Sequence, residues 1–225
     1  MPLQNRVTPY GEIQAVPSRG TMLGNRGRLH NKQQELTRNW RTVNWLSCRL
    51  QFRGRQRQVM GPASYTELFF LDEATSFAAG HRPCSECRNA DYLRFKRAWM
   101  AAYELTELPD AQTVDHTLAR HRLDPGRSRQ IWHEQNRDDL PDGTMVHWQG
   151  SPWLVWGARV FRWTHDGYVN AAARDHLPQQ ATVITPRCTV RVLRAGYRPL
   201  VHETVGSSFP CNPPQKATEG KAAQA

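Results

Sequence analysis

The sequence lacks several features that would place the protein outside the cytoplasm. None of its apolar runs approaches the roughly 20 residues that span a membrane. Residues 1–15 do not have the basic and then apolar profile of a secretory signal, so export is not expected. The five cysteines are an odd number, and a C-x-x-C pair among them is not typical of a disulfide framework. We therefore expect a cytoplasmic protein with reduced thiols and no contact with a membrane.

Lysine is scarce, and so are acidic side chains in the first sixty residues. The chain has only four lysines, so arginine carries nearly all of its net charge of +10. Residues 1–60 hold eleven basic residues against Glu12 and Glu35, a net charge of +9, whereas residues 61–225 are close to neutral. Such a concentration is typical of proteins that contact nucleic acid, although a GC-rich genome also produces an arginine bias. The candidate nucleic-acid-binding residues are Arg26, Arg28, Arg49, Arg53, Arg55 and Arg57.

Motifs of the common catalytic centres are missing as well. The glycines form neither a phosphate-binding loop nor a G-x-G-x-x-G turn, and no serine lies in a nucleophile elbow. His116 and His121 are five positions apart, which is the wrong spacing for one helical face, and the later histidines are dispersed. Catalytic residues therefore stay unassigned, and a role without catalysis is favoured.

The most informative segment that is present is Ala-Ala-Gly-His-Arg-Pro-Cys-Ser-Glu-Cys-Arg, residues 78–88, which contains a C-x-x-C turn. Its cysteines, Cys84 and Cys87, can direct two thiolates at one tetrahedral zinc ion. Because Zn²⁺ takes four ligands in structural sites, the remaining ligands must come from other parts of the chain.

Hydrophobic periodicity predicts an α+β fold, in which a small zinc-stabilised β/α unit is followed by helices and then by a C-terminal antiparallel β unit. In the first half, the predicted strands are 45–52, 56–60 and 65–71, and the predicted helices are 72–79, 89–104 and 110–123, the last with Asp110 as its N-cap. In the second half, the predicted strands are 144–149, 153–156, 160–163, 182–185 and 189–193.

The same pattern suggests how the chain is organised. The expected parts are a loose N-terminal arm (1–20), a zinc-binding β/α domain with helices (21–124), a linker or long loop (125–143), an antiparallel β unit (144–209) and a disordered tail (210–225).

Residues 74–87 resemble the second half of the Ada-type metal-binding module, a small zinc module of a DNA-methylation sensor. In that module a strand and a short helix with an alanine-rich end lead into Gly-aromatic-Arg-Pro-Cys-x-x-Cys. Here the corresponding residues run from Gly80 to Cys87, with His81 in the aromatic position. The resemblance covers about residues 65–88, and it implies a zinc site and contact with DNA.

The resemblance also implies two more ligands close together before the strand, but the chain has no such pair there. The candidates are Cys48 and His30, which are separated by seventeen residues. His30 ends a glycine-rich turn, and Cys48 lies on the apolar face of a predicted strand, where a buried thiol is the alternative interpretation. His81 is a further candidate ligand beside the C-x-x-C turn. Cys188 and Cys211 are expected to be free thiols.

The sequence thus predicts a bacterial Zn²⁺-binding protein that contacts nucleic acid, DNA or RNA, through its basic first sixty residues. A closed shell of Cys48, Cys84, Cys87 and His30 would be structural, because catalytic zinc keeps a position for water. One alternative is a metal-dependent enzyme acting on nucleic acid, of the nuclease or repair type. Another is a protein-interaction module whose arginine content reflects only the genome.

Overall fold

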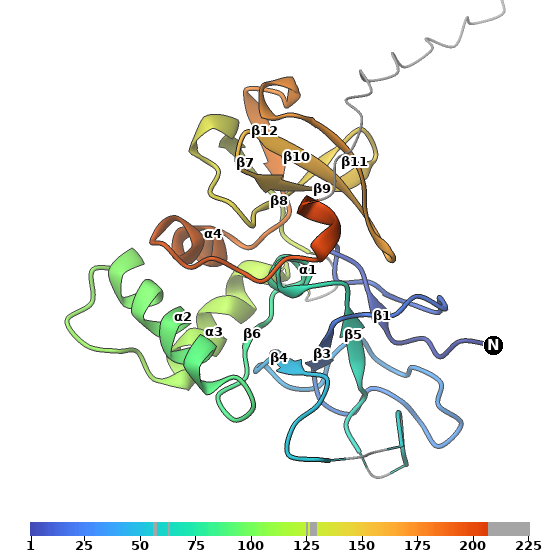
Figure 1. The fold of residues 1–225 in the computed structure, drawn as a ribbon. Helices are drawn as coiled ribbons and strands as arrows, with labels where there is room; N and C mark the ends of the chain where they lie inside the picture. Colours follow the sequence, from blue (N-terminus) through green and yellow to red (C-terminus); the bar gives the residue numbers. More distant parts are fainter. Residues whose placement is uncertain (56–57, 63, 125, 127–129, 207–225) are drawn as a thin grey trace, which may run out of the picture.

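A computed structural model of the chain describes residues 1–55, 58–62, 64–124, 126 and 130–206, and it confirms the α+β class (Figure 1). Its N-terminal sheet has six strands in the order β2-β1-β5-β3-β4-β6. These are β1 (Arg6–Val7), β2 (Ile13–Gln14), β3 (Met22–Asn25), β4 (Leu46–Arg49), β5 (Leu68–Phe70) and β6 (Arg82–Pro83). The pairs β1–β5 and β4–β6 are parallel, and the other neighbours are antiparallel.

The C-terminal sheet also has six strands, in the order β11-β10-β9-β8-β12-β7, and every neighbouring pair is antiparallel. Its strands are β7 (His133–Asn136), β8 (Met145–Trp148), β9 (Ser151–Trp156), β10 (Arg159–Thr164), β11 (Gly167–Ala173) and β12 (Gln180–Val183). The predicted antiparallel β unit is therefore present, with β7 and β11 in addition to the strands that the sequence indicated.

Four α-helices complete the described fold: α1 (Glu73–Ala78), α2 (Asn89–Ala102), α3 (Ala111–Arg122) and α4 (Arg187–Arg194). Short 3₁₀ turns lie at η1 (Arg137–Asp139), η2 (Arg174–His176) and η3 (Glu203–Gly206). Helices α2, α3 and α4 lie together beside the sheets (Figure 1) and share an apolar cluster built around Phe95, Trp99, Leu118 and Val192. Asp110 caps α3 as predicted, since its carboxylate accepts a hydrogen bond from the Thr113 backbone N–H at 2.7 Å. None of the described helices is long and apolar enough to cross a membrane.

Helix α1 is the element that connects the cores. Ala74 and Ala78 pack against the C-terminal sheet, Phe77 packs among α2, α3 and α4, and Ala79 at the end of the helix packs against the N-terminal sheet. This six-residue helix and its C-cap residue therefore take part in three apolar clusters. The division into a domain of residues 21–124 and a β unit of residues 144–209 stays a prediction, but both sheets pack against α1 or its C-cap residue.

The structure differs from the sequence pattern in three places. Residues 1–20, expected to be a loose arm, contribute β1 and β2 to the sheet, because Val7 and Ile13 are buried there. The expected linker 125–143 contains strand β7 and η1. The expected strand 189–193 is wrong: these residues lie in α4, where Cys188 and Val192 face the helical cluster and Val190 faces the C-terminal sheet.

Two other expectations fall partly or wholly on residues that are not described. The predicted strand 56–60 includes two of them, and its described part, residues 58–60, is not in a strand. The predicted disordered tail, residues 210–225, lies outside the described residues.

Candidate metal centre

Three cysteines meet where the N-terminal sheet is followed by α2. The sulfur atoms of Cys48, Cys84 and Cys87 all lie within 4.8 Å of one another. This separation allows all three sulfurs to bind one metal ion. Cys48 comes from β4, and Cys84 and Cys87 come from the turn between β6 and α2, so the group joins two separate segments.

Pairing of the short strand β6 with β4 brings the segments together. The two strands run parallel, with Ser47 opposite Pro83, and the backbone N–H of Cys84 donates to the carbonyl of Ser47 at 2.9 Å. Each segment then continues by one or a few residues to its cysteine. The parallel register therefore sets the distance between Cys48 and Cys84.

A buried ion pair holds β6 against helix α3. The guanidinium of Arg82 donates to both carboxylate oxygens of Asp115, at 2.7 and 2.8 Å. Both side chains are almost inaccessible to solvent, with exposed fractions of 4% and 7%. Two parallel hydrogen bonds between planar groups fix orientation as well as distance. This contact therefore positions the strand that leads directly into Cys84.

The turn that carries Cys84 and Cys87 is closed by backbone hydrogen bonds. The N–H of Arg88 donates to the carbonyl of Cys84 at 3.1 Å, and α2 begins at the next residue. From the other segment, the backbone N–H of Arg49 points at the sulfur of Cys87, 3.4 Å away. N–H groups directed at sulfur and a nearby helix N-terminus both stabilise thiolates, the form that binds metal.

The thiols also influence one another's protonation. Hydrogen bonds from Cys48 and Cys87 lower the pKa of the Cys84 thiol far below its ordinary value. Hydrogen bonds to Cys84 and Cys87, followed by burial, raise the pKa of the Cys48 thiol. Of the three thiols, Cys84 is therefore the one whose ionisation these hydrogen bonds favour. A divalent ion would replace the remaining thiol protons, and its binding would release them.

The donor set suits a thiophilic ion. Soft thiolate ligands favour zinc and copper(I) over magnesium or calcium, which prefer oxygen. Cys84 is buried, whereas Cys48 and Cys87 are partly exposed, so solvent can reach one side of the group. The three sulfurs thus fit a zinc ion, and the identity of the metal belongs to the proposal below.

The two candidate histidines lie elsewhere. His30 is buried, and its ring nitrogens are hydrogen-bonded to the Thr66 hydroxyl at 2.6 Å and the Gly61 carbonyl at 3.1 Å. His81 is buried between the rings of Trp45 and Phe70. Within the described residues, the group of potential metal ligands at this site contains three cysteines and no histidine. His30 as fourth ligand stays a prediction, and it requires one ring nitrogen to give up its present hydrogen bond.

The remaining cysteines have separate positions. Cys188 is fully buried in α4, and burial raises the pKa of its thiol to about 12. It is a free thiol, as predicted. Cys211 lies outside the described residues.

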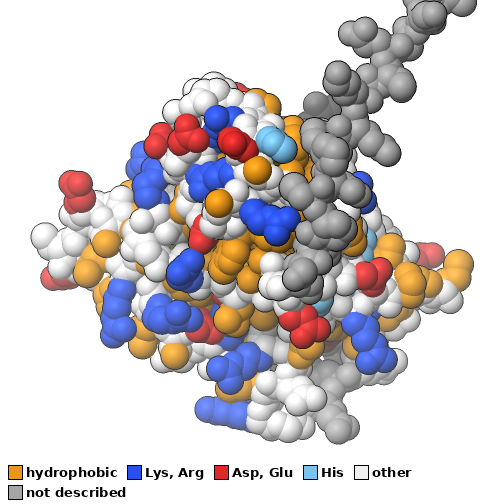
Figure 2. Space-filling model, turned by 45° about the horizontal axis from the view of Figure 1, so that its top comes forward, with side chains coloured by type: hydrophobic (Ala, Val, Ile, Leu, Met, Phe, Trp, Pro, Cys, Tyr) orange, Lys and Arg blue, Asp and Glu red, His pale blue; other side chains and the backbone are white. Residues whose placement is uncertain are grey.

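The candidate nucleic-acid-binding arginines divide into buried and exposed groups. Arg26 is only 1% exposed, so it is not part of an outer surface. Arg57 lies outside the described residues, and the remaining four candidates, Arg28, Arg49, Arg53 and Arg55, are exposed. On the face drawn in Figure 2, Lys and Arg side chains are spread among Asp and Glu, so charge alone does not define one patch there.

Three of the exposed arginines, Arg49, Arg53 and Arg55, lie close to the three cysteines in sequence or in space. Arg49 follows Cys48 directly, and the guanidinium of Arg55 forms an ion pair with Glu86, inside the C-x-x-C turn, at 2.7 Å. Arg53 lies over the ring of Phe52. The metal site and this basic segment are therefore physically continuous.

Comparison of the chain with protein-family models, with curated proteins and with solved structures found no match. The Ada-type resemblance of residues 65–88 thus stays a prediction from the motif, and only the clustering of the three cysteines supports it structurally.

Proposed function

We propose that the chain is a zinc-binding protein in which Cys48, Cys84 and Cys87 hold a structural Zn²⁺, and that the arginines beside this site contact nucleic acid. The observation that carries the proposal is the approach of three sulfurs to within 4.8 Å from two segments of the chain. Isolated cysteines are often inert core residues. Three that converge from two segments, two of them partly exposed, are better explained by a shared ion.

In this role the ion fastens β4 to the start of α2. The flanking contacts, from the parallel strand pair to the Arg82–Asp115 ion pair, already hold the two segments in register. Zinc with three thiolates carries a net charge of −1, which the nearby Arg49, Arg53 and Arg55 favour electrostatically. The fourth position is taken by His30 after rearrangement or by a ligand from solvent.

Metal content tests the first part of the proposal. The full chain purified without chelator should contain one zinc ion per molecule, and Cys48→Ser and Cys84→Ser should each lose it. Cys188→Ser is the matched control, because it removes a thiol that lies in another cluster. His30→Ala identifies the fourth ligand. Zinc retained at full occupancy in Cys48→Ser would contradict the site.

Salt dependence tests the second part. Binding of a short DNA or RNA duplex should weaken steeply as salt rises, because arginine–phosphate contacts release counterions. Replacing Arg49, Arg53 and Arg55 together by alanine should reduce the slope of log affinity against log salt by about 2–3. The control replaces the exposed Arg187, Arg191 and Arg194 of α4, which removes the same charge elsewhere. If both triple variants lose the same affinity for nucleic acid, the attraction is nonspecific, and the assignment of these arginines to nucleic-acid binding is wrong.

A metal-dependent enzyme acting on nucleic acid is the second candidate. It is favoured by one observation: within the described residues three protein ligands converge, and catalytic zinc sites also use three and leave one position open. Incubation of labelled DNA and RNA with the protein, with and without chelator, distinguishes the two roles. Metal-dependent cleavage or modification that is lost in Cys84→Ser would favour the enzyme.

A further inference from the structure

A buried arginine lies beside a small cavity, away from the cysteines. Arg26 follows β3, and its side chain is almost completely buried. Within the described part of the chain, no Asp or Glu forms an ion pair with it. Burial, and then the charge of Arg122, lowers the pKa of Arg26 to about 9. Buried charges are normally paired, because an unpaired ion loses its hydration without compensation.

Two of the three guanidinium nitrogens have partners. Nε donates to Nε2 of His81 at 3.1 Å, and Nη1 donates to the carbonyl of Gly11 at 3.0 Å. His81 therefore carries its proton on Nδ1, which donates to the Ser76 carbonyl. The third nitrogen, Nη2, is buried and has no hydrogen-bond partner in the described structure. A buried donor left in this state marks a place where a ligand can supply the missing acceptor.

The cavity beside Arg26 has a volume of about 270 Å³ and aromatic walls. Tyr10, Trp40 and Trp45 line it together with Arg26. The guanidinium carbons of Arg26 and Arg122 lie 4.1 and 3.8 Å from the centre of the Trp45 ring, so two cations are gathered around one indole. The volume lies just below the range of about 300–1,000 Å³ typical of pockets for drug-sized ligands. The cavity is therefore large enough for a small ligand that consists of one anionic group and one ring.

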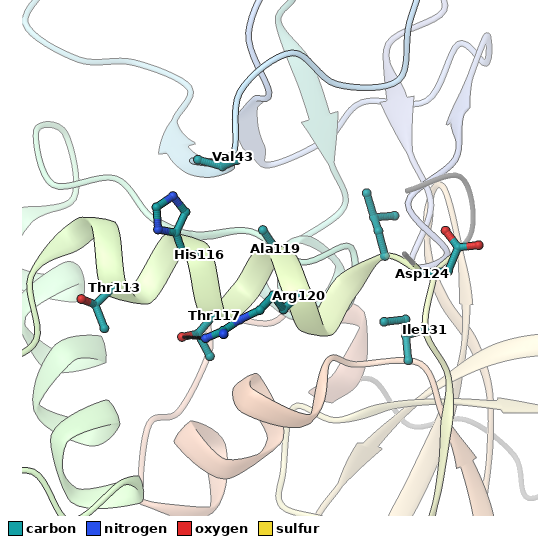
Figure 3. A pocket seen from close by; sticks show the side chains of 9 residues that line it. Val43, Thr113, His116, Thr117, Ala119, Arg120, Asp124 and Ile131 are labelled. Atoms are coloured by element: carbon teal, nitrogen blue, oxygen red, sulfur yellow. Dashed lines mark hydrogen bonds between the residues drawn. The ribbon is translucent and has the colours of Figure 1, made fainter. Parts of the chain in front are cut away.

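A wider cavity of about 780 Å³ adjoins the smaller one along α3 and shares Leu123 with it. Figure 3 shows its lining: His116, Thr117 and Arg120 project from α3, and Val43 lies across from the helix. Leu123 therefore lies between the two cavities.

The geometry points to an anion-binding site at Arg26, with a phosphate monoester carried by a flat aromatic group as its ligand class; a 5′-mononucleotide is the representative compound. The phosphate would accept from Nη2 of Arg26, and the ring would lie against Trp40 or Tyr10. A planar guanidinium recognises phosphate by directed hydrogen bonds, and aromatic side chains stack on bases. This site does not involve the cysteines and does not depend on the metal.

One acidic residue tests the sign of the ligand's charge. Of the described residues that line the smaller cavity, only Glu12 is acidic. It is exposed, and its carboxylate accepts from the side-chain amide of Gln14 at 3.2 Å. An anion in the cavity is repelled by Glu12, so Glu12→Gln should bind it more tightly, whereas a neutral ligand should not respond.

Calorimetric titration of the full chain provides the test. Inorganic phosphate and adenosine 5′-monophosphate should each bind with one-to-one stoichiometry, the nucleotide more tightly, and adenosine should bind far more weakly than either. Arg26→Lys and Arg26→Met should weaken binding of the nucleotide by about 10- to 100-fold, the loss expected for a charge-assisted hydrogen bond. Arg38→Met removes an equal charge from the exposed loop and should bind like the wild type.

Because Arg26 variants can fail to fold, Glu12→Gln and the wild-type titrations carry the test independently. Absence of saturable binding of both phosphate and the nucleotide to the folded wild type would overturn the proposal. So would equal binding of adenosine, or unchanged affinity in Glu12→Gln. Oligonucleotides with and without a 5′-phosphate distinguish a free mononucleotide from a strand end as the source. Zinc content measured in the same samples separates this result from that for the metal site.

Discussion

The phenol hydroxyl of Tyr168 in β11 donates a hydrogen bond to the carboxylate of Asp72 at 2.9 Å, across 96 positions of sequence. The same oxygen accepts from the backbone N–H of His202 at 3.0 Å. The other oxygen caps α1, because it accepts from the N–H and hydroxyl of Thr75. One buried carboxylate thus connects the C-terminal sheet, the chain that follows it, and the helix on which both sheets pack.

Tyr168→Phe should lower the free energy of unfolding by about 1–2 kcal/mol, because it removes one hydrogen bond to a buried charged group. Asp72→Ala should lower it by more, since it also removes the N-cap of α1 and leaves several donors unpaired. Urea denaturation measures both. Tyr92→Phe is the control: the Tyr92 hydroxyl makes no hydrogen bond to the described part of the chain. Equal losses in Tyr168→Phe and Tyr92→Phe would contradict the role of the Asp72 contact.

Asp115→Ala should destabilise the fold by about 3–5 kcal/mol, because it leaves the buried guanidinium of Arg82 without its partner. The double variant Arg82→Met/Asp115→Leu should recover most of that loss, since it leaves no unpaired buried charge at this contact. Glu86→Ala breaks the exposed pair with Arg55, whose side chains are 54% and 43% exposed, and should change stability by less than about 1 kcal/mol. The positioning of β6 by Arg82 would be refuted by zinc affinity that is unchanged in Asp115→Ala.

The stability of the protein should depend on pH through His81. Burial, and then the charges of Arg26 and Arg122, hold the pKa of His81 well below its ordinary value. As pH falls below about 6.5, the unfolded chain takes up a proton at this position before the folded chain does. Stability from the neutral ring is thus fully present above that pH and is lost as pH falls toward the folded-state pKa.

Between pH 7 and pH 5, His81→Gln should therefore lose less stability than the wild type, by up to about 2 kcal/mol. Chemical denaturation at the two pH values gives the comparison. Exposed His176→Gln serves as the control. If the wild type and His81→Gln lose equal stability between pH 7 and pH 5, the assignment of a neutral, buried His81 ring is wrong.

Gly80 should not tolerate a side chain. Its φ is +82°, and a Cβ atom built there would lie 2.7 Å from Cδ of Arg122. Gly80→Ala should therefore cost about 2 kcal/mol or more, from backbone strain together with steric overlap. Gly157→Ala isolates the backbone contribution, since φ is +59° and no atom of the described residues lies within 4 Å of the added atom. Its cost should be about 1 kcal/mol. Thermal unfolding of the pair measures the difference, and equal costs would exclude the overlap with Arg122.

Local signals in the sequence were sufficient for much of the helical structure. Asp72 and Asp110 were recognisable helix starts, and the aromatic spacing from Tyr92 to Tyr103 gave α2, because capping and helical periodicity involve only near neighbours. Helix α4 was misjudged for the same reason. Val190 and Val192 alternate as in a strand, but two different clusters cover the two sides of a helix there, and no local pattern contains that information.

In the candidate site, too, local spacing predicts some residues, whereas the others depend on contacts between distant segments. Cys84 and Cys87 share one turn, so their spacing was enough to place them together. The approach of Cys48 depends on the parallel pairing of β4 with β6, and the surroundings of His30 depend on residues 61 and 66, which are distant in sequence. Net charge also could not tell that Arg26 is buried while Arg28, two positions later, is exposed, because composition does not report burial.

The position of Cys48, 36 residues before Cys84, has a consequence for the unfolded chain. An ion bound by both ends acts as a reversible cross-link that closes a long loop, and such closure removes entropy from the unfolded ensemble. Arg49, Arg53 and Arg55 all lie within that loop. With the proposed zinc bound, these arginines would therefore stay inside a closed loop even in the unfolded chain, whereas the metal-free unfolded chain would leave that loop open.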